Sequence, residues 1–217
     1  MVSNDNRIQN VINFYTLCNK LKDVVRTGWK DWGVSRDRVE SVAEHIYGTQ
    51  MLAVAIWSEY RYDIDIMRVL SMLALHELEE TKIGDLTSFD IDRKSKTILG
   101  HNVVEEILKP LLKGDSIKDL IYEFDARLTK EAQFAYFCDK LECDIQCKLN
   151  DEEGCVDYHK DLENEARKNE CVKQVLEEEK SWSKMWLRFD IDKNKYEGPF
   201  LDIAKFVKDN DIKTNKQ

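Results

Sequence analysis

The chain has 217 residues, of which 42% are hydrophobic and 35% are charged, with only 8 Gly and 2 Pro. This length is enough for one domain with a continuous core, or for one domain with a helical extension. So few turn-forming residues favour long helices over sheets. The formal net charge of −9 repels polyanions, which argues against sequence-independent binding to DNA or RNA.

Targeting and cysteine patterns favour a cytoplasmic location. The N-terminal segment 1–10 is polar, and no apolar run is long enough to span a bilayer, so we expect neither a secretory signal nor a membrane partner. The six cysteines form no Cys-x-x-Cys pair. We therefore expect reduced and mostly buried thiols.

Helical periodicity predicts the first elements of the chain. Apolar residues at helical spacing predict a helix near 6–24, followed by a loop over 26–38 that holds two tryptophans. Ser41 and Glu44 form a capping-box pattern, in which the hydroxyl accepts from the Glu amide and the carboxylate reaches back. A second helix is therefore expected from Ser41 to about Tyr60.

The rest of the chain also has a helical pattern. Asp63 or Asp65 can cap a third helix, and its run 69–75 is apolar almost all round, so this helix should be central. Further segments are predicted as helices near 94–112, 116–124 and 129–150, a long charged helix near 156–188, a short helix after Pro199, and a frayed tail over 209–217. No repeat or alternating strand pattern is present, which predicts an all-α bundle with one core.

Two histidines and two acidic residues lie at positions where a solvent-exposed polar side chain would be unusual. His76 directly follows the apolar run and is followed by Glu77, while His45 lies one turn into the capped second helix. Asp139 lies in the middle of a largely apolar helical segment. Because burying an unpaired carboxylate is costly, such an Asp usually has a cation or several donors as its partner.

Nitrogen and oxygen donors together suit divalent Mn, Fe, Co, Ni or Zn better than Ca. The alternative is that the histidines are ordinary core residues, hydrogen-bonded to their neighbours. Spacing alone leaves both interpretations open.

Four segments follow one another in the chain: RTGW at 26–29, VESVAEH at 39–45, LHELEE with GDL at 75–86, and CDKLE at 138–142. In this order they resemble HD-domain phosphohydrolases, which carry an H…HD…D signature, and in particular their 5′-deoxynucleotidase-like branch. The resemblance covers about residues 7–150 and implies an HD-domain helical bundle with a C-terminal helical extension. The domain would span 1–190, and 191–217 would form a short helix and tail.

The resemblance also implies the roles of particular residues. The positions of His45, His76 and Asp139 match metal ligands, and Glu77 takes the place of the Asp of the HD pair. The implied cofactor is a divalent metal ion (Mn, Co, Fe, Ni or Zn), and a homodimer is typical of the proteins that the chain resembles.

Four further positions match catalytic and substrate-binding residues. Glu80, which lies one turn after His76 on the same helix face, matches a catalytic carboxylate, and Asp85 matches a second acid near the substrate. Arg26 can hold phosphate with its bidentate fork, and Trp29 can pack on a sugar or base.

The chain departs from the family pattern at Glu77. Glu is one methylene longer than Asp, which moves the carboxylate by about 1.5 Å, roughly the rise of one helical residue. Glu77 could fold back and still ligate, bind bidentately, favour another ion, or lose the metal. In addition, the loop after Asp85 reads Leu-Thr-Ser where related sequences often have Pro-Thr, which bears on substrate preference.

Three functions remain open from the sequence. The favoured one is removal of the 5′-phosphate from (deoxy)nucleoside monophosphates, with a small-molecule nucleotide as partner. The second is another HD-type hydrolase, acting on a guanosine tetraphosphate-like substrate. The third is a nucleotide-binding protein without activity, its site impaired by Glu77.

Two remaining features are interpreted as structural. His101 follows Gly100 in a polar stretch and is expected at the surface. Trp182, Trp186 and Phe189 recur at helical spacing, which indicates a core or dimer stripe.

Overall fold

A computed structural model describes residues 4–159 and 165–213 and shows only helices there, with no strand. The all-α prediction is confirmed. The helices are α1 (Asn4–Asn19), the 3₁₀ helix η1 (Lys20–Lys22), α2 (Thr27–Asp31), α3 (Val42–Glu59), α4 (Ile66–Leu75), α5 (Glu80–Ile83), α6 (Arg93–Leu108), α7 (Gly114–Ala126), α8 (Lys130–Glu152), α9 (Glu165–Lys168), α10 (Glu170–Glu179), α11 (Trp182–Asn194) and α12 (Gly198–Asp209).

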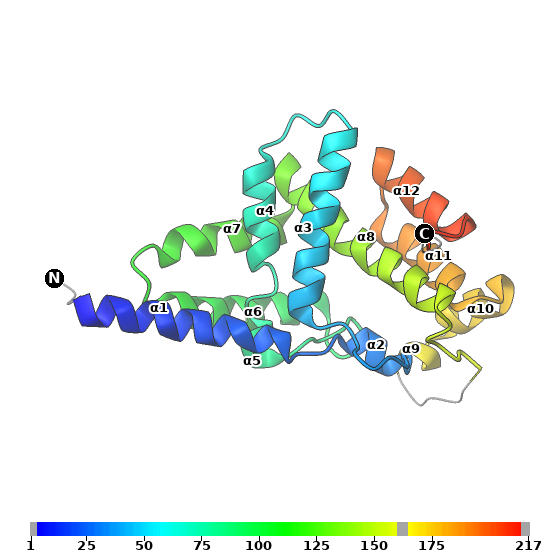
Figure 1. The fold of residues 1–217 in the computed structure, drawn as a ribbon, viewed down its shortest axis with the longest axis horizontal. Helices are drawn as coiled ribbons and strands as arrows, with labels where there is room; N and C mark the ends of the chain where they lie inside the picture. The colour runs from blue at the N-terminus through cyan, green and yellow to red at the C-terminus, as the bar shows by residue number, and fades with distance from the viewer. Residues whose placement is uncertain (1–3, 160–164, 214–217) are drawn as a thin grey trace.

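Helix α8 is the centre of the molecule. It packs against α3, α4 and α7 and also against α11 and α12 (Figure 1). A residue on α8 can therefore reach both the N-terminal and the C-terminal parts of the chain. This position makes α8 the natural carrier of a site that both parts line.

Local capping explains where α3 and α4 begin. The Ser41 hydroxyl accepts from the Glu44 amide, and the Glu44 carboxylate accepts from the Ser41 amide, which confirms the predicted capping box. Asp65 rather than Asp63 caps α4, because its carboxylate accepts from the second and third amides of the helix. The predicted central position of α4 is confirmed by Met72, which is fully buried.

The prediction of one long helix over 156–188 is wrong. Asn169 caps α10, Lys180 ends it in the left-handed conformation with φ 53°, and Ser181 caps α11. Such a break between helices costs little free energy, because the residue before each new helix has a side chain that accepts from the first free amides of that helix. Residues 160–164 of the predicted helix lie outside the described residues.

Two smaller differences occur near the ends of the chain. The predicted loop over 26–38 contains the short helix α2. The helix expected after Pro199 is α12, with this proline in its first turn. The prediction of a frayed tail over 209–217 is wrong at its start, because Asp209 belongs to α12 and the amides of Ile212 and Lys213 donate to Glu152. Residues 214–217 of this tail lie outside the described part.

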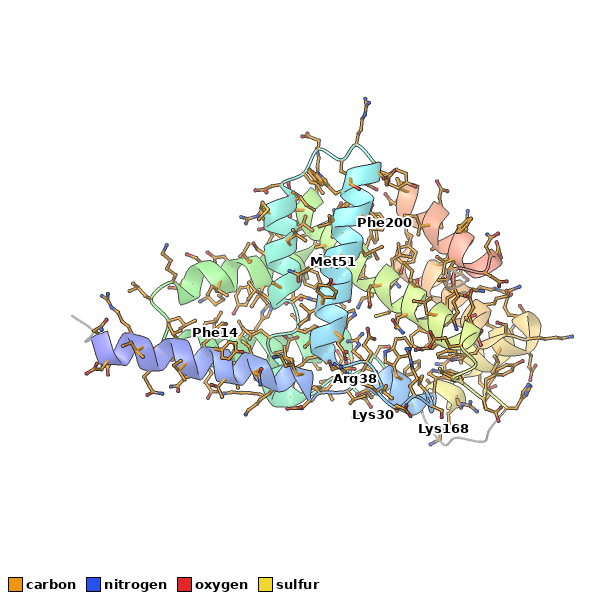
Figure 2. All side chains as sticks on the ribbon, in the orientation of Figure 1. Phe14, Lys30, Arg38, Met51, Lys168 and Phe200 are labelled. Atoms are coloured by element: carbon orange, nitrogen blue, oxygen red, sulfur yellow. The ribbon has the colours of Figure 1, made fainter. Side chains whose placement is uncertain are left out.

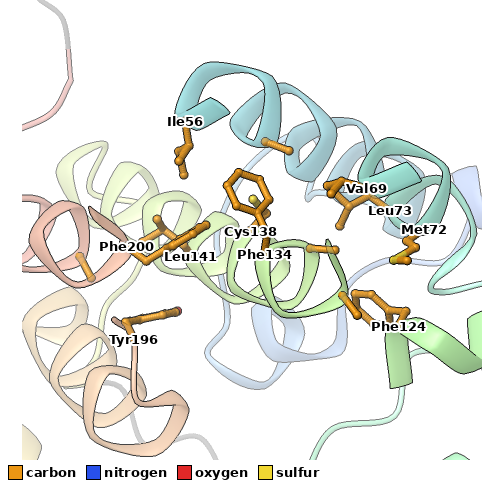
Figure 3. Close-up of a cluster of buried hydrophobic side chains, with 14 residues drawn as sticks. Ile56, Val69, Met72, Leu73, Phe124, Phe134, Cys138, Leu141, Tyr196 and Phe200 are labelled. Carbon is orange, nitrogen blue, oxygen red and sulfur yellow. The ribbon is translucent and has the colours of Figure 1, made fainter. Parts of the chain in front are cut away.

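The largest apolar cluster lies between α3, α4, α8 and α12 (Figure 3). Its members include Ile56 of α3, Leu73 of α4, Phe134 of α8 and Phe200 of α12. Figure 2 shows Phe200 between α12 and the end of α3. The C-terminal helix therefore shares the core of the N-terminal helices, and the predicted division after residue 190 stays a prediction.

Among the described helices, none combines the length and the apolar character needed to cross a bilayer.

Candidate metal centre and substrate cavity

His45 lies in the first turn of α3, and two carboxylates fix its ring. The ring is fully buried, with Nδ1 2.6 Å from Glu142 Oε2 and Nε2 3.1 Å from Asp139 Oδ1. Because a carboxylate accepts, Nδ1–H donates to Glu142. This arrangement directs Nε2 towards Asp139, as in metal sites where a second carboxylate orients a ligating histidine.

His76 directly follows the last residue of α4, and its Nε2 has no partner among the described residues. Its Nδ1 lies 2.8 Å from the Leu73 carbonyl oxygen, which only accepts, so Nδ1 carries the proton. Nε2 is buried and has no hydrogen-bond partner in the described part of the chain. A neutral His76 therefore directs a lone pair to a point between Glu77 Oε1, at 3.6 Å, and Asp139 Oδ1, at 3.7 Å.

Two carboxylates complete the cluster. His45, His76, Glu77 and Asp139 are all buried, and one ligand atom from each lies within 4.8 Å of the others. Lys140 Nζ lies 2.8 Å from Asp139 Oδ2, which leaves Oδ1 facing both histidines. The four positions that the resemblance singled out are thus brought together, and this mixed nitrogen and oxygen set could hold a divalent cation.

Glu77 reaches the cluster despite its extra methylene. Burial alone would raise its pKa, but the neighbouring His76 ring, followed by Lys96 and Arg26, lowers the pKa of Glu77 to about 2. The carboxylate is therefore ionised at neutral pH. Of the alternatives that the sequence left open, the observed geometry favours those in which Glu77 faces the metal position.

Glu80 is the first residue of α5 and is almost completely buried. Its Oε1 accepts from Lys96 Nζ at 3.0 Å, while Oε2 has no partner among the described residues. Burial, followed by the negative charge of Glu77, raises the pKa of Glu80 to about 10. Glu80 is thus a carboxyl group that keeps a proton at neutral pH.

Asp85 ties the 26–29 segment to the loop after α5. Its Oδ2 accepts from the Thr27 amide at 2.6 Å, and the Thr27 hydroxyl donates to the Asp85 carbonyl at 2.6 Å. Arg26 Nη1 lies 3.5 Å from Asp85 Oδ1 and 3.6 Å from Glu77 Oε1. Two carboxylates therefore hold Arg26 beside the cluster of candidate metal ligands.

Trp29 is a wall of the site and is itself buried. Its Nε1–H donates to Glu40 Oε2 at 2.6 Å, and its ring packs on Trp186 with a centroid distance of 5.2 Å. The prediction of a core stripe is confirmed for Trp182, which is fully buried in this aromatic cluster, whereas Trp186 and Phe189 of the same stripe are only partly buried and line the cavity described next.

A cavity of about 590 Å³ joins these residues, a volume within the usual range of small-molecule sites. Of the residues predicted from sequence, six line it: His76, Glu77, Asp139, Arg26, Trp29 and Asp85. His45 and Glu80 are not among the lining residues.

Several residues of the site were missed by sequence reasoning. Lys96 and Lys140 line the cavity and pair with its acids, and Glu142 orients His45. Lys140 and Glu142 both lie in the CDKLE motif with Asp139 and so left a signal, whereas Lys96 lies outside every quoted motif. His101, predicted at the surface, has a side chain that is 29% exposed, and it also lines the cavity, with its Nε2 2.7 Å from Asp125 Oδ2.

Comparison with known proteins agrees with this geometry. A family model described as "HD domain" matches residues 18–189. The chain belongs to the HD-domain family. Among its HD-domain relatives, the 5′-deoxynucleotidase HDDC2 of Dictyostelium discoideum is 33% identical over 147 residues, which are 64% of this chain and 76% of that protein. The 5′-deoxynucleotidase HDDC2 of Homo sapiens is 30% identical and covers 64% of this chain and 67% of its own. These relatives place the chain in the 5′-deoxynucleotidase-like branch.

Solved structures share the HD-domain fold. A conserved hypothetical protein from Pyrococcus furiosus superposes with a TM-score of 0.58 at 24% identity, covering 85% of this chain and 98% of that one. A protein described as a predicted metal-dependent phosphohydrolase from Magnetospirillum magnetotacticum gives a TM-score of 0.60 at 19% identity, covering 93% and 97%. At these identities the likeness concerns the fold.

Proposed function

We propose that this chain is a metal-dependent phosphohydrolase that removes the 5′-phosphate from deoxynucleoside monophosphates. The observation that carries the proposal is the buried, unpartnered Nε2 of His76, which faces two carboxylates at the wall of the cavity. Relatives named 5′-deoxynucleotidases supply the substrate class.

The metal ion would be held by His45, His76, Glu77 and Asp139. The candidate ions are Mn, Co, Fe, Ni and Zn. When bound, such an ion polarises a phosphoryl oxygen and lowers the pKa of its water. The cluster fits this cofactor because both histidines have their other nitrogen fixed by an acceptor.

Arg26 would bind the phosphate group. Its guanidinium lies at the cavity wall next to Glu77 and Asp85, and it can present a bidentate fork to phosphate oxygens. Lys96 and Lys140 add positive charge to the same wall. This local charge lets a protein with a formal charge of −9 attract an anionic substrate.

Glu80 would act as a positioning residue behind the cavity wall, because it does not itself line the cavity. Its Oε1 accepts from Lys96 Nζ, and Lys96 lines the cavity, where it would face the substrate. The catalytic role that the resemblance implies for Glu80 stays a prediction. Asp85 would act as a positioning residue, since it holds the Arg26 segment through Thr27.

The competing functions receive less support. A nucleotide-binding protein without activity would require Glu77 to have broken the site, whereas its carboxylate lies within the cluster. No observed feature favours a guanosine tetraphosphate-like substrate.

We also propose a homodimer in the cytoplasm. Helix α1 exposes Ile8, Val11, Ile12 and Tyr15 at helical spacing, and α3 exposes Met51, which points away from the core (Figure 2). Apolar faces of this kind mark association surfaces. Light scattering of the purified protein should give the mass of two chains. The mass of one chain would contradict the homodimer.

The test combines metal content with phosphate release. The purified protein should contain a stoichiometric divalent metal and release phosphate from deoxynucleoside monophosphates with Mn²⁺ or Co²⁺ added. His76→Ala should lose both properties. His159→Ala, which changes an exposed histidine, should keep both. Absence of metal and of turnover under every added ion would contradict the proposal.

A further inference from the structure

Helix α11 forms a wall of the same cavity, although the C-terminal third carries no motif of the family. Trp186 packs directly on the 26–29 segment: a side-chain carbon at Gly28 would lie 3.4 Å from its ring, and the ring lies beside Trp29. Phe189 also lines the cavity. The site therefore has an aromatic wall from α11 in addition to the charged wall at the metal cluster.

Asn194, the last residue of α11, lines the cavity and has a side-chain donor without a partner in the described part of the chain. Its Oδ1 accepts from the Tyr136 hydroxyl at 3.0 Å, which fixes the orientation of the amide. Its Nδ2 is buried and has no partner among the described residues, although Asn194 lines the cavity. Because an unsatisfied buried donor is costly, this position is suited to an acceptor supplied by a ligand.

Aromatic faces and one fixed polar group are the parts of a nucleobase site. Aromatic rings stack on any nucleobase. A hydrogen-bond donor in a fixed position, by contrast, distinguishes the bases by the groups on their edges. We propose that α11 forms the nucleobase subsite, with Trp186 and Phe189 packing on the base and Asn194 Nδ2 donating to a carbonyl oxygen of guanine, thymine or uracil. This inference rests on the proposed function, since it takes a nucleotide as the substrate.

The occupied oxygen of Asn194 argues against adenine. The usual bidentate pairing of Asn with adenine needs the amide oxygen as acceptor and the amide nitrogen as donor. Here Oδ1 is taken by Tyr136, so only the donor is free. An adenine amino group at this position would face another donor, whereas a base with a carbonyl there would be bound.

The test variant replaces the Nδ2 donor of Asn194 by an acceptor. Asn194→Asp keeps an oxygen for Tyr136 and replaces the amide nitrogen by a second oxygen. We expect kcat/KM for deoxyguanosine and thymidine monophosphates to fall about tenfold relative to deoxyadenosine monophosphate, which is about 1.4 kcal/mol. Hydrolysis of 2-deoxyribose 5-phosphate, which has no base, should not change. Asp192→Asn on the exposed side of α11 is the matched control and should leave all ratios as they are.

Binding of free thymidine, followed by tryptophan fluorescence, separates this inference from the proposed function. If the wild-type protein releases no phosphate but Asn194→Asp weakens thymidine binding, the activity is wrong and the subsite stands. If phosphate is released but the base ratios and thymidine binding are the same in Asn194→Asp, or shift equally in Asp192→Asn, the subsite is wrong. Asn194→Ala is assayed in the same way if the Asp variant does not fold.

Discussion

At the scale of single residues, Glu142 decides how His45 faces the metal position. Its carboxylate lies 2.6 Å from Nδ1, and it packs so closely on Gly48 of α3 that a side chain there would collide with it. A side chain at position 48 would therefore displace the Glu142 carboxylate from this position. The carboxylate that orients the ring is built into this helix contact.

We predict that Glu142→Gln weakens metal binding. The amide can present its N–H₂ to Nδ1 and so favour the wrong tautomer, and changes to such orienting groups typically cost about 10–100-fold in metal affinity or activity. Titration with Mn²⁺ under competition from a chelator measures the affinity. Glu59→Gln, at the exposed end of α3, is the control. Equal affinity in Glu142→Gln and wild type would show that Glu142 has no orienting role.

The metal-facing residues and Arg26 could be predicted at this scale, but Lys96 and Asn194 could not. His45, His76, Glu77 and Asp139 lie in short motifs whose order is characteristic, so a family resemblance finds them. Lys96 and Asn194 lie in helices without any motif, and only the packing of α6 and α11 brings them to the cavity. Sequence spacing contains no information on such contacts.

At the scale of elements, the capping box of α3 sets the turn that carries His45. We predict that Ser41→Ala lowers the free energy of unfolding by about 1 kcal/mol, because the Glu44 amide loses its acceptor. Urea denaturation measures this change. Ser58→Ala removes an exposed hydroxyl near the other end of α3 and should have a smaller effect. Equal losses in the two variants would mean that the cap contributes nothing specific.

The contact between α8 and α11 contains two buried carboxyl groups. Tyr196 donates to Asp144 Oδ2 at 2.8 Å, and burial, followed by the charge of Asp190, raises the pKa of Asp144 well above its ordinary value of 3.8. The folded chain thus keeps a proton that the unfolded chain releases above about pH 4. Its stabilising contribution is therefore present at low pH and is lost as the pH rises towards the folded pKa.

We predict that Asp144→Asn removes this pH dependence. The free energy of unfolding of the variant, relative to wild type, should increase between about pH 5 and pH 8, because wild type alone loses stability from this group. Urea denaturation at both pH values measures the difference. A constant difference across this range would show that Asp144 is ionised in the folded protein.

The element boundaries in the C-terminal third show what a periodic pattern misses. The charged run over 156–188 has no Pro, so periodicity alone extends one helix through it. The side chains of Asn169 and Ser181 give the observed starts, and both residues are recognised caps. The left-handed conformation of Lys180 between them has no sequence signal, because lysine seldom adopts it.

At the scale of the whole molecule, α12 closes the core that also supports the metal ligands. Phe200 is 2% exposed and packs edge-on against Phe134 of α8, with a centroid distance of 5.2 Å. Phe134 lies on the helix that carries Asp139. The fold class was predictable from composition and periodicity, but this long-range closure was not, because it joins residues far apart in the chain.

We predict that Phe200→Ala lowers the free energy of unfolding by about 3–5 kcal/mol, the usual cost of removing a large buried aromatic ring. Phe206→Ala on the same helix is the control, since Phe206 is 59% exposed and should change stability by no more than about 0.5 kcal/mol. A small effect in both variants would separate α12 from the core and support a boundary near residue 190.

We propose that this chain hydrolyses nucleotides with a metal held by His45, His76, Glu77 and Asp139. The most direct test is phosphate release from deoxynucleoside monophosphates before chelation, after removal of metal by a chelator, and after each divalent ion is restored. We expect activity that is lost on chelation and regained with Mn²⁺ or Co²⁺, and never regained in His76→Ala. Phosphate release that survives complete removal of the metal would contradict a metal-dependent reaction.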